Sequence, residues 1–396
     1  MTDTTKRRPA DGPTRPTNTE HPAMLGSFRN WMRLLGDHRA IDRAFLPRAL
    51  FVALTTLATS PLRTWERIRY GRAIRRTPIH PEPIFIIGHW RSGTTHLLNL
   101  LALDEAFGAL TTFQAMAPGF CLVGDGAIKR LIARQAAERY PTRLIDSIPL
   151  AFDAPQEDEF GLANLSPHAF IHTFSFPRHA EEIFARSVLF DSFSAEEHAR
   201  WIETYLRLLQ TATRANGGRR LIVKNCAHTA RIPTLLDLFP NAKFIHIHRN
   251  PYEVYLSTLH MHRTVFPRSQ LQVVEPERIE TNVLHFYDAL MHRFLEDRRL
   301  IPEGNLVEVR FDDLEMDPIE QLASIYDSLG LPGFAAAEPA FRSYLDSISG
   351  YRKNAYELSR GIIEVVNRHW PYAFDAWGYE RLDPAGIWRQ DNAQPE

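Results

Sequence analysis

The sequence has little of several features that define whole classes of proteins. Only two of its 396 residues are cysteines, Cys121 and Cys226, and two cysteines cannot build a disulfide framework. A reducing, cytoplasmic environment is therefore expected. The 46 basic and 47 acidic side chains leave a formal net charge of −1, which argues against a general polyanion binder such as a DNA-binding protein. We expect no nucleic-acid partner.

Long apolar runs are also missing. The only candidate membrane element, Ala49–Thr59, has about half of the ~20 residues that a transmembrane helix requires. We expect a buried core helix or a contact in a homodimer; the alternative is peripheral membrane contact through residues 44–70, because arginines flank the run. The first 25 residues are rich in Pro, Thr and Arg, lack the apolar region of a signal peptide and are expected to be disordered.

Short apolar segments alternate with helical patterns. This alternation predicts an α/β fold with a P-loop-like central parallel sheet flanked by helices. Two helices have clear boundary signals: Ser194 and Glu197 form a capping box, while Asp317-Pro318 and Gly330 mark a start and an end. The predicted strands are Ile84–Ile87, Leu221–Val223, Phe244–His248 and Leu306–Arg310.

Four regions are expected along the chain. Residues 1–25 form a tail, residues 26–80 an N-terminal helical segment, residues 81–380 the main domain and residues 381–396 a C-terminal tail. Within the main domain, about residues 104–215 contain several helical patterns and no clear strand. This helical insertion is where a substrate-specific cap would lie.

A strand, a glycine-flanked turn and a helix follow one another in Ile84–Asn99, IFIIGHWRSGTTHLLN. This order points the backbone N–H groups of the turn and a helix N-terminus at one anion. The spacing from Gly88 to Gly93 imitates the nucleotide P-loop, G-x4-G-K-S/T, but threonine occupies the position of the phosphate-binding lysine. A cation returns within the turn as Arg91. The loop therefore suits a phosphate or sulfate group better than the γ-phosphate and Mg²⁺ of ATP.

A second anion motif lies far along the chain, in KFIHIHRNPYEVYLS from Lys243 to Ser257. Arg249 ends the predicted strand, and Asn250-Pro251 opens a helix. Ligands of open α/β sheets bind at the carboxyl ends of the strands, so Arg249 is expected on the same rim as the first loop. Arg249 and Ser257 together offer a planar donor fork and a hydroxyl.

Two anion sites on one rim suit a nucleotide with phosphate at both ends, and here the chain resembles the sulfotransferases that use 3′-phosphoadenosine 5′-phosphosulfate. Arg91–Thr95, RSGTT, is similar to their 5′-phosphosulfate loop. Arg249 and Ser257 are similar to their 3′-phosphate pair at the same eight-residue offset. Val223–Ile232, VKNCAHTARI, resembles a strand end of the bacterial and carbohydrate-type branch. The resemblance covers roughly residues 80–380. Arg352-Lys353-Asn354 is only weakly similar to the family's C-terminal Arg-Lys-Gly phosphate clamp.

The resemblance implies a set of binding residues and an in-line transfer without a metal. Arg91 and Lys224 are the candidates for neutralising the charge that grows on the leaving phosphate; one such donor is commonly worth about 10²–10³ in rate. Cytosolic members have a lysine in place of Arg91 and often an adenine-stacking tryptophan in place of His96. The residues expected to bind the co-substrate are Arg91, Ser92, Gly93, Thr94, Thr95, Arg249 and Ser257.

Three residues are candidates for the base that removes the acceptor proton. PQEDEF, residues 155–160, places three carboxylates behind a proline expected to start a helix, although an acidic first turn also matches the helix dipole. Family members with an RSGTT loop often use a glutamate base, which implies Glu159 or Glu157. His228 is the second choice because histidine titrates near neutral pH, and the alternative is a structural histidine before a helix.

The leading function is sulfuryl transfer to a hydroxyl or amine of a small-molecule, lipid or glycan acceptor. A P-loop kinase or NTPase is a weaker hypothesis, because the loop lacks the phosphate-binding lysine. In addition, no later strand clearly ends in an acidic residue that could hold a metal ion. A non-catalytic nucleotide-binding protein on the same scaffold is the third class.

Overall fold

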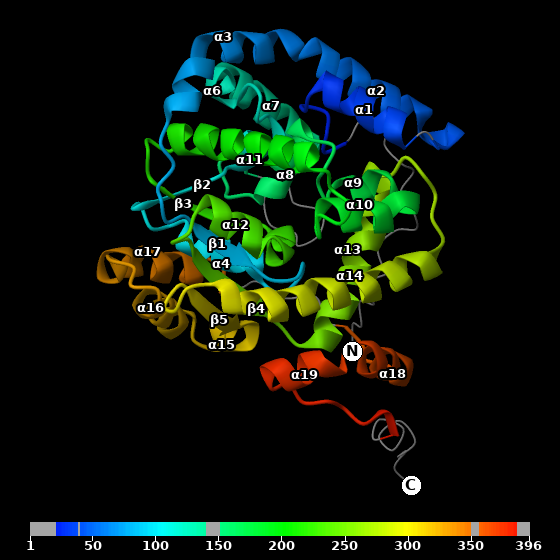
Figure 1. Ribbon diagram of the computed structural model, residues 1–396, viewed down its shortest axis with the longest axis vertical. Helices are drawn as coiled ribbons and strands as arrows, with labels where there is room; N and C mark the ends of the chain where they lie inside the picture. Colours follow the sequence, from blue (N-terminus) through cyan, green and yellow to red (C-terminus); the bar gives the residue numbers. More distant parts are fainter. Residues whose placement is uncertain (1–20, 39, 140–150, 350–355, 386–396) are drawn as a thin grey trace, which may run out of the picture.

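The computed structural model describes residues 21–38, 40–139, 151–349 and 356–385. At its centre lies a five-stranded parallel sheet with the strand order β2-β3-β1-β4-β5 (Figure 1). The strands are β1 (Ile84–Ile87), β2 (Phe107–Ala109), β3 (Arg220–Lys224), β4 (Lys243–His248) and β5 (Leu306–Arg310).

Helices cover both faces of this sheet. In chain order they are α1 (Phe28–Asp37), η1 (Arg43–Phe45), α2 (Leu46–Ala58), α3 (Ser60–Arg76), α4 (Thr94–Leu101), α5 (Thr112–Met116), α6 (Cys121–Gly124), α7 (Ala127–Arg139), α8 (Asp158–Leu165), α9 (His172–Ser175), η2 (Pro177–His179), α10 (Ala180–Ser187), α11 (Ala195–Ala215), η3 (Cys226–Ala230), α12 (Ile232–Leu238), α13 (Pro251–Ser269), α14 (Pro276–Asp297), η4 (Arg298–Leu300), α15 (Phe311–Met316), α16 (Pro318–Ser328), α17 (Phe334–Ser347), α18 (Arg360–His369) and α19 (Pro371–Trp377).

Alternate residues of the central strand enter two separate cores. Phe85 and Ile87 of β1 join the core beneath α8, α11, α13 and α14, whereas Ile84 and Ile86 join the core beneath α4, α15, α16 and α17. All four side chains are buried, as expected for a parallel strand covered on both faces. This three-layer α/β arrangement confirms the predicted fold class, and it brings the carboxyl ends of β1, β3 and β4 to one rim.

The predicted strands and helix signals are confirmed. Ser194 and Glu197 form the capping box of α11, and the Asp317 side chain accepts from the Glu320 amide at the start of α16. Asn250 caps α13 by accepting from the Tyr252 amide at 3.0 Å.

Two expectations about the chain's organisation need correction. Residues 104–215 do contain a strand, because β2 pairs with the edge of β3; its three residues, Phe-Gly-Ala, are too short to give a strand pattern. Residues 1–20 lie outside the described part, but His21 and Leu25 of the predicted tail are buried, and His21 bonds Ser175 at 3.0 Å. Residues 21–25 therefore pack on the protein and do not belong to a disordered tail.

Candidate active site

The turn after β1 adopts a backbone shape that only its glycines permit easily. Gly88 has φ 137° and Gly93 has φ 97°, and Arg91 between them has φ 72°. A Cβ atom at Gly88 would overlap the carbonyl oxygen of Ile247, and one at Gly93 would overlap the Phe311 ring. Gly93 is also the N-cap of α4, so the first amides of that helix open onto the turn.

Gly93→Ala tests this geometry. The positive φ and the overlap with Phe311 predict a loss of about 1–3 kcal/mol in the free energy of unfolding, measured by urea denaturation. Gly361→Ala is the control, because a Cβ atom at Gly361 meets nothing within 4 Å and its backbone is helical. Equal stability of the two variants would contradict the close packing of the Phe311 ring on Gly93.

The turn is fixed from behind by η3. The Thr229 hydroxyl accepts from the Gly88 amide at 2.8 Å and lies 3.2 Å from the Gly88 carbonyl oxygen. Thr94 is buried, with its hydroxyl 3.6 Å from the sulfur of Cys226, and burial raises the pKa of that thiol to about 12. Cys226 is therefore a neutral packing residue rather than a nucleophile at ordinary pH. Ser92 is buried as well, whereas Thr95 is partly exposed.

The two predicted anion motifs meet in space. The Arg91 Nε donates to the Ser257 hydroxyl at 3.0 Å, although the residues are 166 positions apart. An Arg249 guanidinium nitrogen donates to the Arg91 carbonyl at 3.3 Å. Arg249 also pairs with Glu253 and lies 4.6 Å above the Phe311 ring. Both cations and the serine thus form one rim beside the first turn of α4.

Lys224 and Glu157 form a buried ion pair on the neighbouring strand end. Lys224 is the last residue of β3, and its Nζ contacts a Glu157 carboxylate oxygen. The other oxygen accepts from the Cys226 amide at 3.3 Å. Glu157 is the N-cap of α8; the expected helix-starting proline, Pro155, instead bridges to Thr111. The pair places a cation and a carboxylate side by side.

Glu159 is engaged on all sides. Its carboxylate accepts from both terminal nitrogens of Arg231, at 2.9 and 3.1 Å, and from the side-chain Nδ2 of Asn225 at 2.6 Å. The Phe170 backbone amide is a further donor at 2.6 Å. Burial by itself would raise the pKa of Glu159, but the Arg231 guanidinium and the donors Asn225 and Phe170 together outweigh burial and lower the pKa below the usual value. A fully buried, saturated carboxylate does not suit a general base that must reach an acceptor.

His228 is enclosed in the same way. Its Nε2 lies 2.7 Å from the Tyr205 hydroxyl and 3.3 Å from an Asp158 oxygen, and its Nδ1 lies 3.2 Å from Arg231. The side chain has no solvent exposure. The geometry therefore favours the structural alternative for His228.

Sequence reasoning missed two residues that shape this rim, Asn225 and Tyr356. Asn225 donates to both Asp158 and Glu159 at 2.6 Å and so holds the start of α8 against the end of β3. The Tyr356 hydroxyl donates to Ser257 at 3.3 Å. Asn225 stands within the family-like phrase VKNCAH, which was a usable signal, whereas nothing near Tyr356 in sequence indicated it. Arg352-Lys353-Asn354 lies outside the described residues.

The histidines of β4 pack as structural residues. His246 stacks on Phe294 with ring centroids 3.7 Å apart, and its Nδ1 lies 3.2 Å from Glu308. Across the described ranges, no group of three or more metal-ligating side chains is present. Within the loop, Trp90 is buried and stacks on Phe170 with ring centroids 3.9 Å apart.

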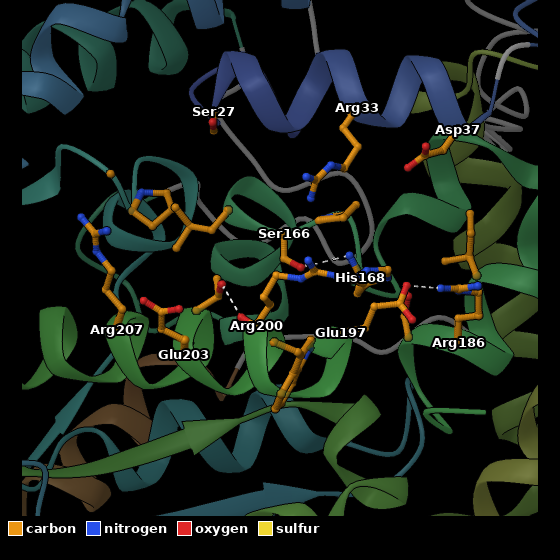
Figure 2. A pocket seen from close by; sticks show the side chains of 18 of the residues that line it. Ser27, Arg33, Asp37, Ser166, His168, Arg186, Glu197, Arg200, Glu203 and Arg207 are labelled. Carbon is orange, nitrogen blue, oxygen red and sulfur yellow. Dashed lines mark hydrogen bonds and ion pairs between the residues drawn. The ribbon is translucent and has the colours of Figure 1, made fainter. Parts of the chain in front are cut away.

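A separate polar cavity of about 930 Å³ lies between α1, α3, α10 and α11. Figure 2 shows Arg33 and Asp37 reaching into it from α1, and Arg200, Glu203 and Arg207 from α11. None of the predicted site residues lines it. Both cations and carboxylates line this cavity, and since it shares no residue with the predicted site it is distinct from the candidate active site.

A family model described as the sulfotransferase family matches residues 83–336, more than half of the chain. This chain belongs to the sulfotransferase family. The match spans the turn, both predicted anion motifs and the strand that carries Lys224. It confirms the resemblance stated from the sequence.

The comparisons with individual sulfotransferases agree. The chain is 33% identical over 373 residues to omega-hydroxy-beta-dihydromenaquinone-9 sulfotransferase Stf3 of Mycobacterium bovis and of Mycobacterium tuberculosis, covering 92% of this chain and 92% of each relative. Its fold is similar to sulfotransferase STF9 from Mycobacterium avium, with a TM-score of 0.70, 19% identity, and coverage of 89% of this chain and 92% of that one. For sulfotransferase STF1 from Mycobacterium tuberculosis the TM-score is 0.66 at 19% identity, covering 87% and 91%.

Membership decides between the function classes. The protein is an enzyme that transfers a sulfuryl group, and the kinase and the non-catalytic binding protein are not favoured.

Proposed function

We propose that this sulfotransferase moves the sulfuryl group of 3′-phosphoadenosine 5′-phosphosulfate to a hydroxyl group of a lipid acceptor. The observation that carries the donor assignment is the 3.0 Å contact of Arg91 with Ser257, which joins the phosphosulfate-type loop to the second anion motif. The amides of Gly93, Thr94 and Thr95 at the start of α4 would bind the 5′-phosphate. Arg249 and Ser257 would bind the 3′-phosphate.

The proposed transfer needs one cation and one base beside the loop. The acceptor oxygen forms a bond to sulfur while the bond from sulfur to the bridging oxygen breaks, and 3′-phosphoadenosine 5′-phosphate leaves with that electron pair. Lys224 would neutralise the charge on the bridging oxygen. Glu157 would take the acceptor proton, since its carboxylate adjoins Lys224 and it is the least enclosed of the candidate bases at 6% exposure.

The acceptor class rests on the relatives. Two relatives that match along 92% of this chain are named for an ω-hydroxylated menaquinone, a lipid quinone with a terminal hydroxyl group. Within the donor loop itself, Trp90 stacks on Phe170, so the side of the loop that faces the core is apolar. A hydroxylated isoprenoid quinone is therefore the acceptor to assay. The proposed enzyme is cytoplasmic and needs no metal ion.

Isothermal titration of the donor product tests the nucleotide assignment. We expect 3′-phosphoadenosine 5′-phosphate to bind without Mg²⁺ and far better than ADP. Arg249→Met should weaken this binding by about 10–100-fold, the loss expected for a charged hydrogen bond, and leave adenosine 5′-phosphate binding nearly unchanged. Arg263→Met is the control, because Arg263 lies on the same helix and is 68% exposed.

Two results would overturn the donor assignment. One is ADP or ATP binding that requires Mg²⁺, and the other is an equal loss for both adenosine nucleotides in Arg249→Met.

A further inference from the structure

The helical segment α2–α3 presents a row of large apolar side chains to solvent. Their spacing of three, four or eight residues places them on one side of the helix. The helices α2 and α3 lie at the upper margin of the molecule, away from the sheet (Figure 1). We call this row the leucine face, and its exposed fractions are Leu46 50%, Leu50 60%, Leu54 56%, Leu57 51%, Trp65 53% and Ile68 77%.

The helical backbone that carries the leucine face continues across the α2–α3 junction, between Leu57 and Trp65. The Thr59 amide donates to the Thr55 carbonyl at 3.0 Å, and the Arg63 amide donates to the Thr59 carbonyl at 3.4 Å. Helical hydrogen bonding therefore continues through the junction. Residues 43–76 thus form one helical segment of 34 residues. Its most apolar stretch has a mean hydropathy of 1.3, and 28% of that stretch is buried in the protein.

The opposite side of α2 is bound to the protein. Ala49 and Val52 are buried against α1, where the Trp31 indole donates to the Ala49 carbonyl at 3.1 Å. The buried Arg48 donates to the Pro267 and Gln270 carbonyls at 2.7 Å. The expectation of a buried core helix is thus correct for one side only, and a helix held in this way lies on a surface instead of crossing a bilayer.

The charged side chains around the leucine face indicate which kind of surface it can bind. Among residues 43–76 the only acidic side chain is Glu66, which is buried and accepts from the Leu122 and Val123 amides at 2.7 and 3.1 Å. The exposed surface of this segment consequently has cations and no carboxylate. The exposed arginines are Arg43, Arg67, Arg69, Arg72, Arg75 and Arg76.

We propose that the leucine face binds the surface of an anionic lipid membrane. Apolar side chains would enter the acyl boundary, with Trp65 at the headgroup level and the arginines against lipid phosphates. A second copy of the chain fits less well, because two such faces would bring their arginines together without a carboxylate to neutralise them. The proposal stands on this face alone and does not depend on the sulfuryl acceptor.

The same contacts fix the membrane relative to the donor rim. α13 begins beside Arg249, and its last turn and the next residue supply the carbonyls that bind Arg48 of α2. α13 is a 19-residue helix, so it spans about 28 Å. Membrane binding would therefore hold the donor rim at a set height above the lipid surface.

Vesicle sedimentation of the full chain tests the proposal. We expect the protein to bind vesicles of mixed phosphatidylglycerol and phosphatidylcholine, and to bind pure phosphatidylcholine vesicles at least about tenfold more weakly. Leu50→Glu/Leu54→Glu should lower binding to the anionic vesicles by at least about tenfold. Leu300→Glu/Met316→Glu is the matched control, because these side chains are 51% and 80% exposed on η4 and α15.

Light scattering and circular dichroism of the same samples complete the experiment. Unchanged helicity of both double variants would show that any lost binding comes from the surface, since all four positions are at least half exposed. Absence of wild-type binding to anionic vesicles would overturn the proposal, as would equal losses for the two double variants. A wild-type dimer that Leu50→Glu/Leu54→Glu dissociates, without vesicle binding, would assign the face to a second copy.

Discussion

Replacing Glu157 with glutamine is expected to lower the rate of sulfuryl transfer by about 10²–10⁴-fold, the usual contribution of a positioned general base. Glutamine keeps the shape of the side chain and removes its proton-accepting charge. The variant also deprives Lys224 of its buried partner, so donor binding must be measured separately. We expect 3′-phosphoadenosine 5′-phosphate to bind Glu157→Gln within a few-fold of wild type, since Glu157 is not among the proposed phosphate ligands.

The pH profile separates a base from a positioning residue. If Glu157 takes the proton, the acidic limb of the wild-type pH–rate profile disappears in Glu157→Gln. If Glu157 only positions Lys224, the rate drops but the profile keeps its shape. Glu303→Gln is the control, because Glu303 is an exposed residue far along the chain. Near-normal turnover of Glu157→Gln would eliminate Glu157 as the base.

Arg231→Met is expected to have the largest effect on stability. Arg231 and Glu159 have no solvent exposure, and removing one member of such a pair leaves an uncompensated buried charge. The expected loss in the free energy of unfolding is about 3–5 kcal/mol, measured by urea denaturation. Arg178→Met is the control: Arg178 pairs with Asp42 at 2.8 Å but is 40% exposed, and such a pair is worth about 0–1 kcal/mol.

A second substitution tests the reason for that loss. Arg231→Met/Glu159→Leu should recover part of the stability, because no buried charge is then left without a partner. If Arg231→Met instead keeps normal stability and loses only turnover, the buried pair belongs to the chemistry and the structural assignment of Glu159 is wrong.

The lowered pKa of Glu159 gives this pair a defined pH dependence. A carboxyl group whose folded pKa lies below its unfolded value contributes stability that is complete above the unfolded pKa, about 4.5 here, and is lost as the pH falls through the folded pKa. The difference in unfolding free energy between wild type and Arg231→Met should accordingly shrink below about pH 4.5.

The choice between the candidate bases shows where sequence reasoning ended. The segment PQEDEF indicated carboxylates near the site, and all three are indeed buried close to the end of β3. Nothing in the segment distinguishes Glu157 from Glu159. The difference arises from Arg231, 72 positions away, whose guanidinium occupies Glu159, and from Lys224, which faces Glu157.

The sequence alone determined the parts that depend on neighbouring residues: the four main strands, the glycine turn before α4, the caps of α11, α13 and α16, and the two anion motifs. Turn angles, caps and strand patterns are set by local sterics and local hydrogen bonds, so contiguous residues suffice to predict them. Only the tertiary structure decided that Arg91 touches Ser257, that Glu159 and His228 are enclosed, and that one side of α2 faces solvent. Those outcomes depend on the strand order and on helices packed from distant parts of the chain, because burial and ion pairing are properties of the assembled fold.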